Sequence, residues 1–227
     1  MSKGAIFDAD GTLLDSMPIW EDAAARFLAG LGIEAEPDLG DTMFRLSLDE
    51  GAAYLKKTYL AGDHGRSMTE EEIKEGVLGV IRDFYVHQVQ PKAGARRFLE
   101  ELAARKVPMY IATSSNREHI RAAFERLGLL HFFDGMITCE EAGASKRQPR
   151  IFLLAADRMG LEPADIFVFE DVIHAIRTAN SAGFVTVGVY DAASSSDNTA
   201  IREESGLYLH SLENWERFRD FALHAEK

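Results

Sequence analysis

The sequence has little of three things: cysteine, positive charge and long apolar runs. Cys139 is its only cysteine, so no disulfide can form within the chain, and a reducing, cytoplasmic location is expected. The apolar stretches are too short to cross a bilayer. Lys and Arg number 25 against 37 Asp and Glu, which gives a net charge of −12. An acidic surface of this kind argues against nucleic acid or an anionic membrane as the main partner.

What the sequence does contain is typical of a globular protein. Of its 227 residues, 46% are hydrophobic and 27% are charged, which excludes a disordered or fibrous chain. This length suits one core domain with a modest insertion, or two small domains.

Residues 15–88 predict helices only. Ser16 is typical of a helix start, and a periodic apolar face follows it. Ser47 and Glu50 fit a capping box that opens a second helix, and Thr69 precedes three acids that open a third.

The rest of the chain alternates between helices and strands. Strands are expected at residues 3–7, 109–112, 135–138, 166–169 and 184–189, with helices between them from residue 91 onward. This alternation predicts an α/β fold with a parallel, doubly wound, Rossmann-like sheet. The serine-rich segment 191–199 predicts a polar, mobile loop.

Two domains follow from this order. Residues 1–14 and 89–227 would form a discontinuous Rossmann-like core, and residues 15–88 an inserted, all-helical cap. In open α/β sheets, ligands bind at the carboxyl ends of the strands. Because the insertion follows the first strand, we expect it to form a lid over the site.

Polar side chains gather near the ends of four predicted strands. In chain order they are Asp8, Asp10 and Thr12, then Thr113, Ser114, Ser115 and Asn116, then Lys146, and finally Glu170 and Asp171. If the strands lie side by side, these residues converge on one crevice. Carboxylates crowded together repel each other, and a hard divalent cation removes that conflict. Oxygen ligands without cysteine or histidine indicate Mg²⁺ rather than Zn²⁺.

The same residues suit phosphoryl transfer, which needs positioning, charge neutralisation and an in-line nucleophile. Asp8 could be that nucleophile, and Asp10 could protonate the leaving oxygen and later activate water. Lys146 and the Thr113 hydroxyl are suited to phosphoryl oxygens, and the helix that opens after Asn116 could add backbone N–H groups. Residues 115 and 118, Ser and Glu, also fit a capping box at that helix.

Four segments together resemble the motifs of the haloacid dehalogenase-like hydrolase superfamily. They are FDADGTLLDS at residues 7–16, Ile111-Ala112-Thr113, Lys146 three residues before a proline, and Phe169-Glu170-Asp171. Their order and spacing match along the chain. The helical block resembles the four-helix cap of the subgroup that includes β-phosphoglucomutase and related sugar-phosphate phosphatases.

The resemblance implies a role for each matched residue and a Mg²⁺-dependent phosphatase of a small phosphorylated metabolite. Asp8 would be the nucleophile and a metal ligand. Asp10 would be the general acid and base, with its backbone carbonyl on the metal. Asp171 would bind the metal directly, and Glu170 directly or through water. The phosphoryl group would be held by Thr113, Ser114 and Lys146.

The main alternative is a sugar-phosphate mutase that resembles β-phosphoglucomutase. Such mutases carry a cap histidine and a cap arginine where this chain has Trp20 and Leu48, although Arg45 is close. Both differences favour the phosphatase. Trp20 is also a candidate for lining the substrate pocket, because such pockets are largely apolar.

Three further alternatives fit less well. Haloacid dehalogenases lack the second aspartate, which is present here as Asp10. Phosphonoacetaldehyde hydrolase needs a Schiff-base lysine in its cap, and Lys56 and Lys57 lie in no matching motif. A non-catalytic binding module would not need all four motifs. The sequence leaves open whether the chain is a monomer or a homodimer.

Overall fold

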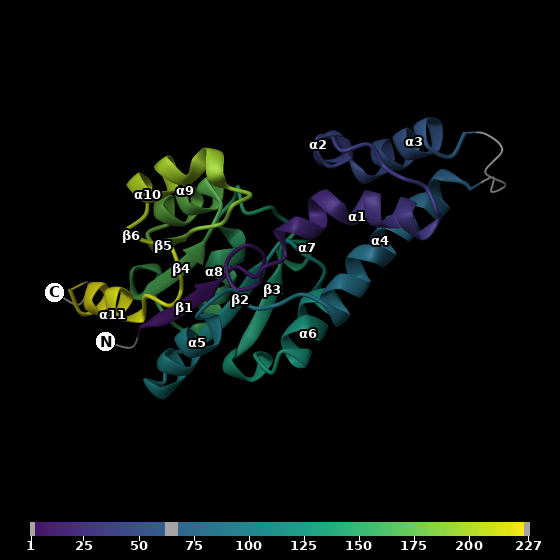
Figure 1. The fold of residues 1–227 in the computed structure, drawn as a ribbon. Coiled ribbons are helices and arrows are strands. Elements are labelled where there is room, and N and C mark those ends of the chain that lie inside the picture. The colour runs from purple at the N-terminus through teal and green to yellow at the C-terminus, as the bar shows by residue number, and fades with distance from the viewer. Residues whose placement is uncertain (1–2, 62–67, 225–227) are drawn as a thin grey trace. The chain divides into compact units, whose positions relative to one another are not determined.

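The chain folds into two units, of which the computed structural model describes residues 3–61 and 68–224 (Figure 1). The core unit consists of Met1–Asp15 and Val89–Lys227, and the helical unit of Ser16–Gln88. Residues 62–67, which belong to the expected helical insertion, lie outside the described residues. Within the described ranges, every helix is too short or too polar to span a membrane.

The core unit is built on a parallel sheet, with six strands in the described part of the chain. In spatial order they are β3 (Gly135–Thr138), β2 (Met109–Thr113), β1 (Gly4–Phe7), β4 (Ile166–Glu170), β5 (Val185–Val189) and β6 (Leu207–Leu209). The central strands β1, β2 and β4 are buried along their whole length. This explains their apolar runs without alternation, since a strand covered on both faces has no solvent side.

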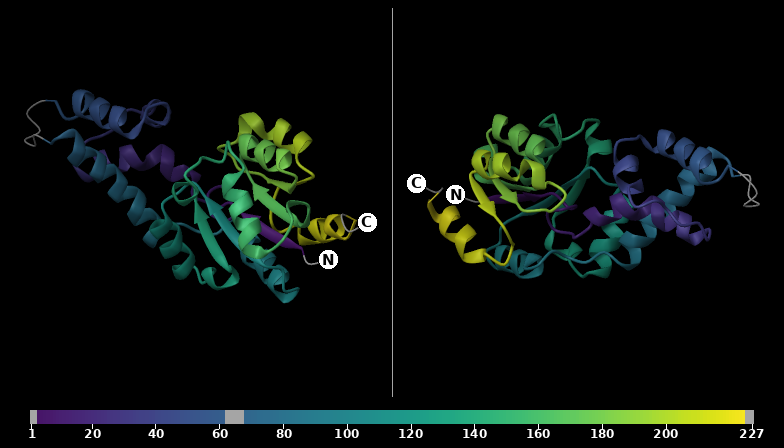
Figure 2. Two further views of the ribbon diagram at one scale, coloured as in Figure 1. Left: turned by 180° about the vertical axis from the view of Figure 1, so that it is seen from behind. Right: turned by 45° about the horizontal axis from the view of Figure 1, so that its top comes forward.

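Helices connect the strands and cover both faces of the sheet. They are α5 (Ala95–Ala104), α6 (Arg117–Arg126), α7 (Cys139–Ala142), α8 (Arg150–Met159), α9 (Ile173–Ser181), α10 (Asn198–Glu204) and α11 (Trp215–His224). Short 3-10 turns lie at Leu130–Phe132, Pro163–Asp165 and Ser195–Asp197. Two views show α9 and α10 on one side of the sheet and α5 and α11 on the other (Figure 1, Figure 2). The predicted doubly wound α/β fold is confirmed.

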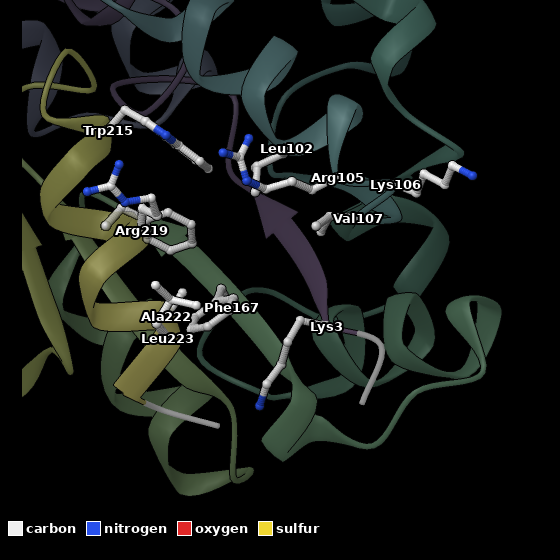
Figure 3. Close-up of a pocket in the computed structure, with 11 residues that line it drawn as sticks. Lys3, Leu102, Arg105, Lys106, Val107, Phe167, Trp215, Arg219, Ala222 and Leu223 are labelled. Carbon is white, nitrogen blue, oxygen red and sulfur yellow. The ribbon is translucent and has the colours of Figure 1, made fainter. Parts of the chain in front are cut away.

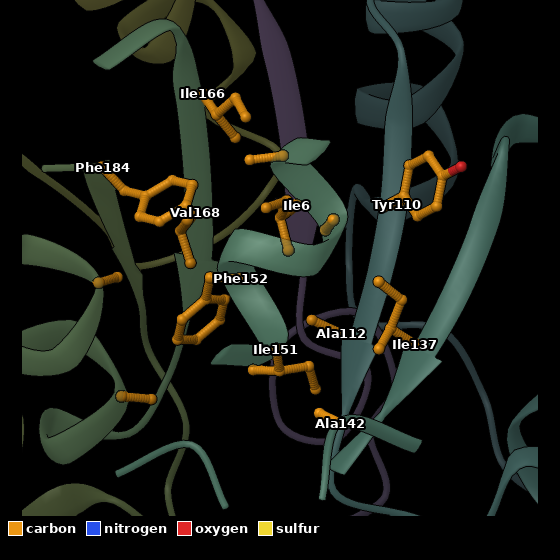
Figure 4. Packing of buried hydrophobic residues seen from close by; sticks show 14 residues of the cluster. Ile6, Tyr110, Ala112, Ile137, Ala142, Ile151, Phe152, Ile166, Val168 and Phe184 are labelled. Carbon is orange, nitrogen blue, oxygen red and sulfur yellow. The ribbon is translucent and has the colours of Figure 1, made fainter. Parts of the chain in front are cut away.

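One face of the sheet packs against α8 and α9. Ile6 of β1 and Val168 of β4 share a buried cluster with Phe152 of α8 (Figure 4). From α9 the cluster receives Ala175 and Ala179, whose small side chains allow close approach to the sheet. This aliphatic layer anchors β1 and β4 side by side.

The opposite face is aromatic. Phe7 and Phe169 are register partners, and their rings stack with centroids 4.2 Å apart. Phe98 of α5 lies 5.1 Å from the rings of Trp215 and Phe218 on α11. Edge-to-face and offset contacts of this kind are the favoured geometries for aromatic pairs. The two layers together fix the strand ends from which Asp8 and Glu170 emerge.

The helical unit contains α1 (Met17–Gly30), α2 (Leu39–Phe44), α3 (Leu48–Thr58) and α4 (Glu70–His87) in its described part. Both expected helix starts are confirmed, because Ser47 with Glu50 and Thr69 with Glu72 form reciprocal capping boxes. Within the unit, α4 packs against α1 and α3. Gly76 permits this, since a Cβ there would lie 2.2 Å from the ring of Phe27.

Several short elements differ from the expectation. Sequence reasoning did not find α2, α7, α10 or β6, all of which are shorter than two helical turns or four strand residues. The expected loop at residues 191–199 is confirmed only in part, because a 3-10 turn and the start of α10 occupy some of it, and its mobility stays a prediction. In addition, Asp191 is only 5% exposed. Elements this short carry too few residues for a periodic pattern, and tertiary contacts hold them in place.

Phe98→Ala should lower the free energy of unfolding of the core unit by about 3–5 kcal/mol, because the ring is fully buried and its removal leaves a cavity. Leu223→Ala is the control, since Leu223 is 57% exposed on α11. Chemical denaturation followed by far-ultraviolet circular dichroism measures both. Equal losses in the two variants would show that the aromatic layer is not a main source of stability.

Candidate active site

The loop after β1 forms one wall of the candidate site. The backbone N–H of Asp8 donates to the carbonyl of Phe169 at 3.0 Å, which continues the pairing of β1 with β4 for one more residue. The chain then turns back on itself, and the N–H of Gly11 donates to the carbonyl of Leu14 at 3.0 Å. Gly11 has a φ of +78°, which favours glycine. The turn therefore places Asp8 at the carboxyl edge of the sheet, beside the end of β4.

Three carboxylates meet at this edge. Oxygen atoms of Asp8, Glu170 and Asp171 all lie within 4.8 Å of one another, and all three side chains are buried. The hydroxyl of Thr12 donates to Asp171 Oδ1 at 3.0 Å and fixes its orientation. A Cβ on Gly11 would lie 2.4 Å from Asp171 Oδ2, so the glycine backbone directly borders this carboxylate.

Among the residues that the structure describes, a lysine lies against two of these acids. Lys146, in the loop between α7 and α8, is buried, and its Nζ donates to Asp8 and, at 2.6 Å, to Glu170 Oε1. A single ammonium cannot balance three carboxylates. The sequence expectation placed Lys146 on a phosphoryl group, and the structure places it against the two acids.

The charge imbalance is visible in the pKa values. Burial raises the pKa of Asp8 well above its usual value; Lys146 opposes this, and Glu170 and Asp171 add to it. Burial, Glu170 and Asp191 raise the pKa of Asp171 to about 8. Burial alone would lower the pKa of Lys146, but the charges of Asp8 and Glu170 outweigh burial and raise it.

These residues fit a hard divalent cation. The donors are carboxylate oxygens, with no sulfur or nitrogen ligand among the three described residues of the cluster. Oxygen donors are the ligands that Mg²⁺ prefers, and Mg²⁺ keeps some of its waters. A bound dication would offset the negative charge that Lys146 leaves uncompensated. The cluster therefore has the chemistry of a metal site.

Asp10 stands apart from the three buried acids. It is half-buried, and its Oδ2 accepts a hydrogen bond from the hydroxyl of Ser115 at 2.6 Å. This bond joins the loop after β1 to the loop after β2. Sequence reasoning placed Ser115 among the polar residues expected at this edge, but it assigned the side chain only a capping role. The pair of adjacent hydroxyl residues after Thr113 was the available signal, but it does not show which of them turns toward Asp10.

The other expected phosphate-binding residues lie in the same loop after β2. Thr113 is buried, and its hydroxyl oxygen accepts from the N–H of Ser115 at 3.0 Å. Ser114 is exposed, with its Oγ 3.3 Å from Cys139 Sγ. Asn116 accepts from the N–H groups of residues 118 and 119. The predicted capping box of residues 115 and 118 is wrong, because α6 begins at Arg117 and its N-cap is Asn116.

Trp20 lies in the other unit, on α1. Its side chain is 37% exposed, which is high for a tryptophan. Whether it lines a substrate pocket stays a prediction.

A separate cavity of about 370 Å³ lies at the amino ends of the strands (Figure 3). Its lining includes Lys3 before β1, Val107 before β2 and Phe167 near the start of β4. The guanidinium of Arg105 lies over the Trp215 ring there, 4.8 Å from its centroid. Since the acid cluster lies at the carboxyl ends of the same strands, this cavity is not part of the candidate site.

A sequence profile of haloacid dehalogenase-like hydrolases matches residues 2–183. The chain belongs to this family. The resemblance inferred from the four motifs is confirmed, and with it the expectation of an enzyme of the hydrolase class.

Relatives within this haloacid dehalogenase-like family include named phosphatases. Validoxylamine A 7′-phosphate phosphatase from Streptomyces hygroscopicus subsp. limoneus is 28% identical over 193 residues, or 83% of this chain and 86% of its own. Phosphorylated carbohydrates phosphatase from Thermotoga maritima is 26% identical over 208 residues, or 91% and 93%. A solved structure from Thermotoga maritima, provisionally named a β-phosphoglucomutase, superposes with a TM-score of 0.83 at 25% identity, covering 96% and 98%.

Gly11→Ala should disturb the acid cluster as well as the backbone. Its Cβ would collide with Asp171 Oδ2, and the positive φ adds strain of roughly 1–2 kcal/mol. Gly160→Ala is the matched control in the core unit, with a φ of +65° and open space around its Cβ position. Thermal unfolding with and without MgCl₂ should show both variants destabilised and only Gly11→Ala deprived of stabilisation by Mg²⁺. The same Mg²⁺ response in both would contradict a metal site beside Gly11.

Proposed function

We propose that this haloacid dehalogenase-like hydrolase is a Mg²⁺-dependent phosphatase of small phosphorylated metabolites, sugar phosphates among them. The observation that carries the proposal is the buried group of Asp8, Glu170 and Asp171 with Lys146 against it. The relatives named as phosphatases of phosphorylated carbohydrates and of a phosphorylated validoxylamine support the substrate class.

Asp8, Glu170 and Asp171 would hold Mg²⁺, together with the backbone carbonyl of Asp10. When bound, the ion would supply charge neutralisation for the attacking carboxylate and the phosphoryl oxygens. Lys146 would stay beside Asp8 and contribute a second positive charge to the phosphoryl group. The hydroxyl groups of Thr113 and Ser114 would donate hydrogen bonds to it. Asn116, as the N-cap of α6, would place backbone N–H groups of that helix near the anion.

The reaction would then run in two transfers. A carboxylate oxygen of Asp8 attacks phosphorus, the bond from phosphorus to the ester oxygen breaks, and Asp10 gives its proton to the leaving alcohol. Asp10 next takes a proton from water, the water oxygen attacks phosphorus, and the Asp8–phosphate bond breaks to release inorganic phosphate. The hydrogen bond from Ser115 would hold Asp10 in place for both proton transfers.

The helical unit would act as a cap. Its supporting feature is its place in the chain, since it is inserted between Asp15 and Val89, directly after the loop that carries Asp8 and Asp10. Closure would exclude water while Asp8 is attacking, and opening would exchange substrate and product. Trp20 would then contact the substrate. The single cysteine and the acidic composition support a cytoplasmic enzyme without a nucleic acid or membrane partner.

A sugar-phosphate mutase is the second candidate. The similarity to the Thermotoga maritima structure provisionally named a β-phosphoglucomutase favours it. A mutase returns the phosphoryl group from its aspartate to the sugar, so it must keep water out for the whole cycle. The cap positions at which such mutases carry a histidine and an arginine hold Trp20 and Leu48. This difference supports the phosphatase.

Asp8→Asn should lower Mg²⁺-dependent phosphate release by at least about 10³-fold, because an amide cannot act as the nucleophile. Asp157→Asn is the control, since Asp157 is exposed on α8. Phosphate release from a panel of sugar phosphates, with MgCl₂ and with EDTA, measures both variants. Activity that survives Asp8→Asn, or that EDTA leaves intact, would refute the proposed mechanism.

Product analysis separates the two candidate functions. With a hexose phosphate as substrate, we expect one free sugar for each inorganic phosphate released, because water accepts the phosphoryl group from Asp8. Phosphorus NMR of the reaction mixture distinguishes free phosphate from isomeric sugar phosphates. Conversion to an isomer with no net release of phosphate would favour the mutase.

A further inference from the structure

Lys92 makes three short hydrogen bonds at the carboxyl edge of the sheet. Its Nζ donates to the carbonyl of Gly11 at 2.8 Å, to the carbonyl of Tyr190 at 2.6 Å and to Asp191 Oδ2 at 2.7 Å. An ammonium has three protons, so each proton has its own acceptor. The side chains of Lys92 and Asp191 are only 18% and 7% exposed. A largely buried charge with all its donors used is a specific arrangement rather than a solvated surface lysine.

The hydrogen bond to Gly11 connects Lys92 to the Asp8–Thr12 loop, which carries the proposed nucleophile Asp8. Gly11 directly follows Asp10, and its backbone borders the carboxylate of Asp171 so closely that a Cβ would collide with it. The next residue, Thr12, donates to the same carboxylate at 3.0 Å. The hydrogen bond from Lys92 to the Gly11 carbonyl therefore determines how closely this loop approaches Asp171.

The other two bonds reach the loop after β5. Asp191 directly follows Tyr190, and its Oδ1 accepts from the N–H of Ala193 at 2.9 Å, which shapes the turn. Ser194, the next residue in that turn, has its hydroxyl 3.4 Å from Asp171 Oδ2. Lys92 thus joins the two loops that contact Asp171.

The backbone around Lys92 is hydrogen bonded to the residues that directly follow the Asp8–Thr12 loop. The N–H of Lys92 donates to the carbonyl of Leu13 at 2.9 Å, and the N–H of Asp15 donates to the carbonyl of Gln90 at 2.9 Å. Leu14 and Pro91 form an antiparallel bridge between these bonds. The base of the lysine side chain is therefore fixed relative to the residues that its ammonium positions.

We propose that Lys92 is a positioning residue for the metal site: it holds the Asp8–Thr12 loop and the loop after β5 at the separation that Asp171 needs to bind Mg²⁺. The proposal rests on the proposed function for the identity of the ion. Lys92 does not contact the ion or the substrate. Its effect is transmitted through Gly11 and through the Asp191 turn.

The test compares two lysines in similar surroundings. Lys92→Met removes the ammonium with all three donors and keeps an unbranched side chain that is one atom shorter. Lys3→Met is the matched control, because Lys3 is 14% exposed and pairs with Asp165 at 3.3 Å at the amino end of the same sheet. Two readouts are taken: the Mg²⁺ concentration for half of the maximal rise in unfolding temperature without substrate, and that for half-maximal hydrolysis of p-nitrophenyl phosphate.

We expect Lys92→Met to raise both Mg²⁺ concentrations by about 10-fold or more, the range seen when residues behind metal ligands are replaced. Lys3→Met should leave both within about twofold of the unsubstituted protein, since it lies far from the ligands. A Lys92→Met protein that loses stability but keeps the original Mg²⁺ concentrations would overturn the proposal and leave Lys92 a purely structural role.

A second variant and the unfolding readout keep the test decisive if a variant does not fold or the protein is inactive. If Lys92→Met does not fold, Lys92→Gln replaces it, because an amide can still donate to one carbonyl; an unchanged Mg²⁺ response in that variant would equally overturn the proposal. If the unsubstituted protein releases no phosphate, the proposed function fails, but the unfolding readout still compares Mg²⁺ binding among the variants.

Discussion

The repulsion among three buried carboxylates is the constraint on which this structure depends. Asp8, Glu170 and Asp171 lie within 4.8 Å of one another, and Lys146 supplies one positive charge against them. Removing charges from water costs several kcal/mol for each ion. A fold selected only for stability would not collect such a group. A divalent cation bound among the three carboxylates would offset this cost, because its charge removes their mutual repulsion.

The sheet fixes the positions of these carboxylates, because they follow or end neighbouring strands. β1 and β4 are neighbours in register, so the residue after Phe7 and the last residue of β4 must emerge side by side. The aliphatic layer on one face and the aromatic layer on the other prevent the strands from sliding. Around this rigid base, short contacts adjust the loops: Ser115 to Asp10, Thr12 to Asp171, and Lys92 to Gly11. Rigid strands thus set the site coarsely, and loop hydrogen bonds set it finely.

The sequence was sufficient for the fold class and for the residues that end the central strands, because short, unbroken apolar runs followed by acidic residues leave a local pattern. It was not sufficient for Lys92, or for the contact that Ser115 makes with Asp10. Their partners lie about a hundred residues away, and nothing in the local sequence shows which lysine or which serine faces the acids. Asn116 illustrates the same limit at short range, since a shift of one residue in the start of α6 decided which side chain caps it. The short α10 and β6 were not predicted, because strand pairing and packing stabilise them and their own sequences show no periodic pattern.

The antiparallel bridge between Leu14 and Pro91 bears on how enzymes of this family could diversify. The chain leaves the core and returns to it through two segments that are hydrogen bonded to each other, so the ends of the insertion are already joined by the core itself. Any segment whose own termini lie close together could be grafted between these two points without disturbing β1 or the acids behind it. Inheritance could therefore act on the two units separately, conserving the residues of the core unit while exchanging the inserted helices.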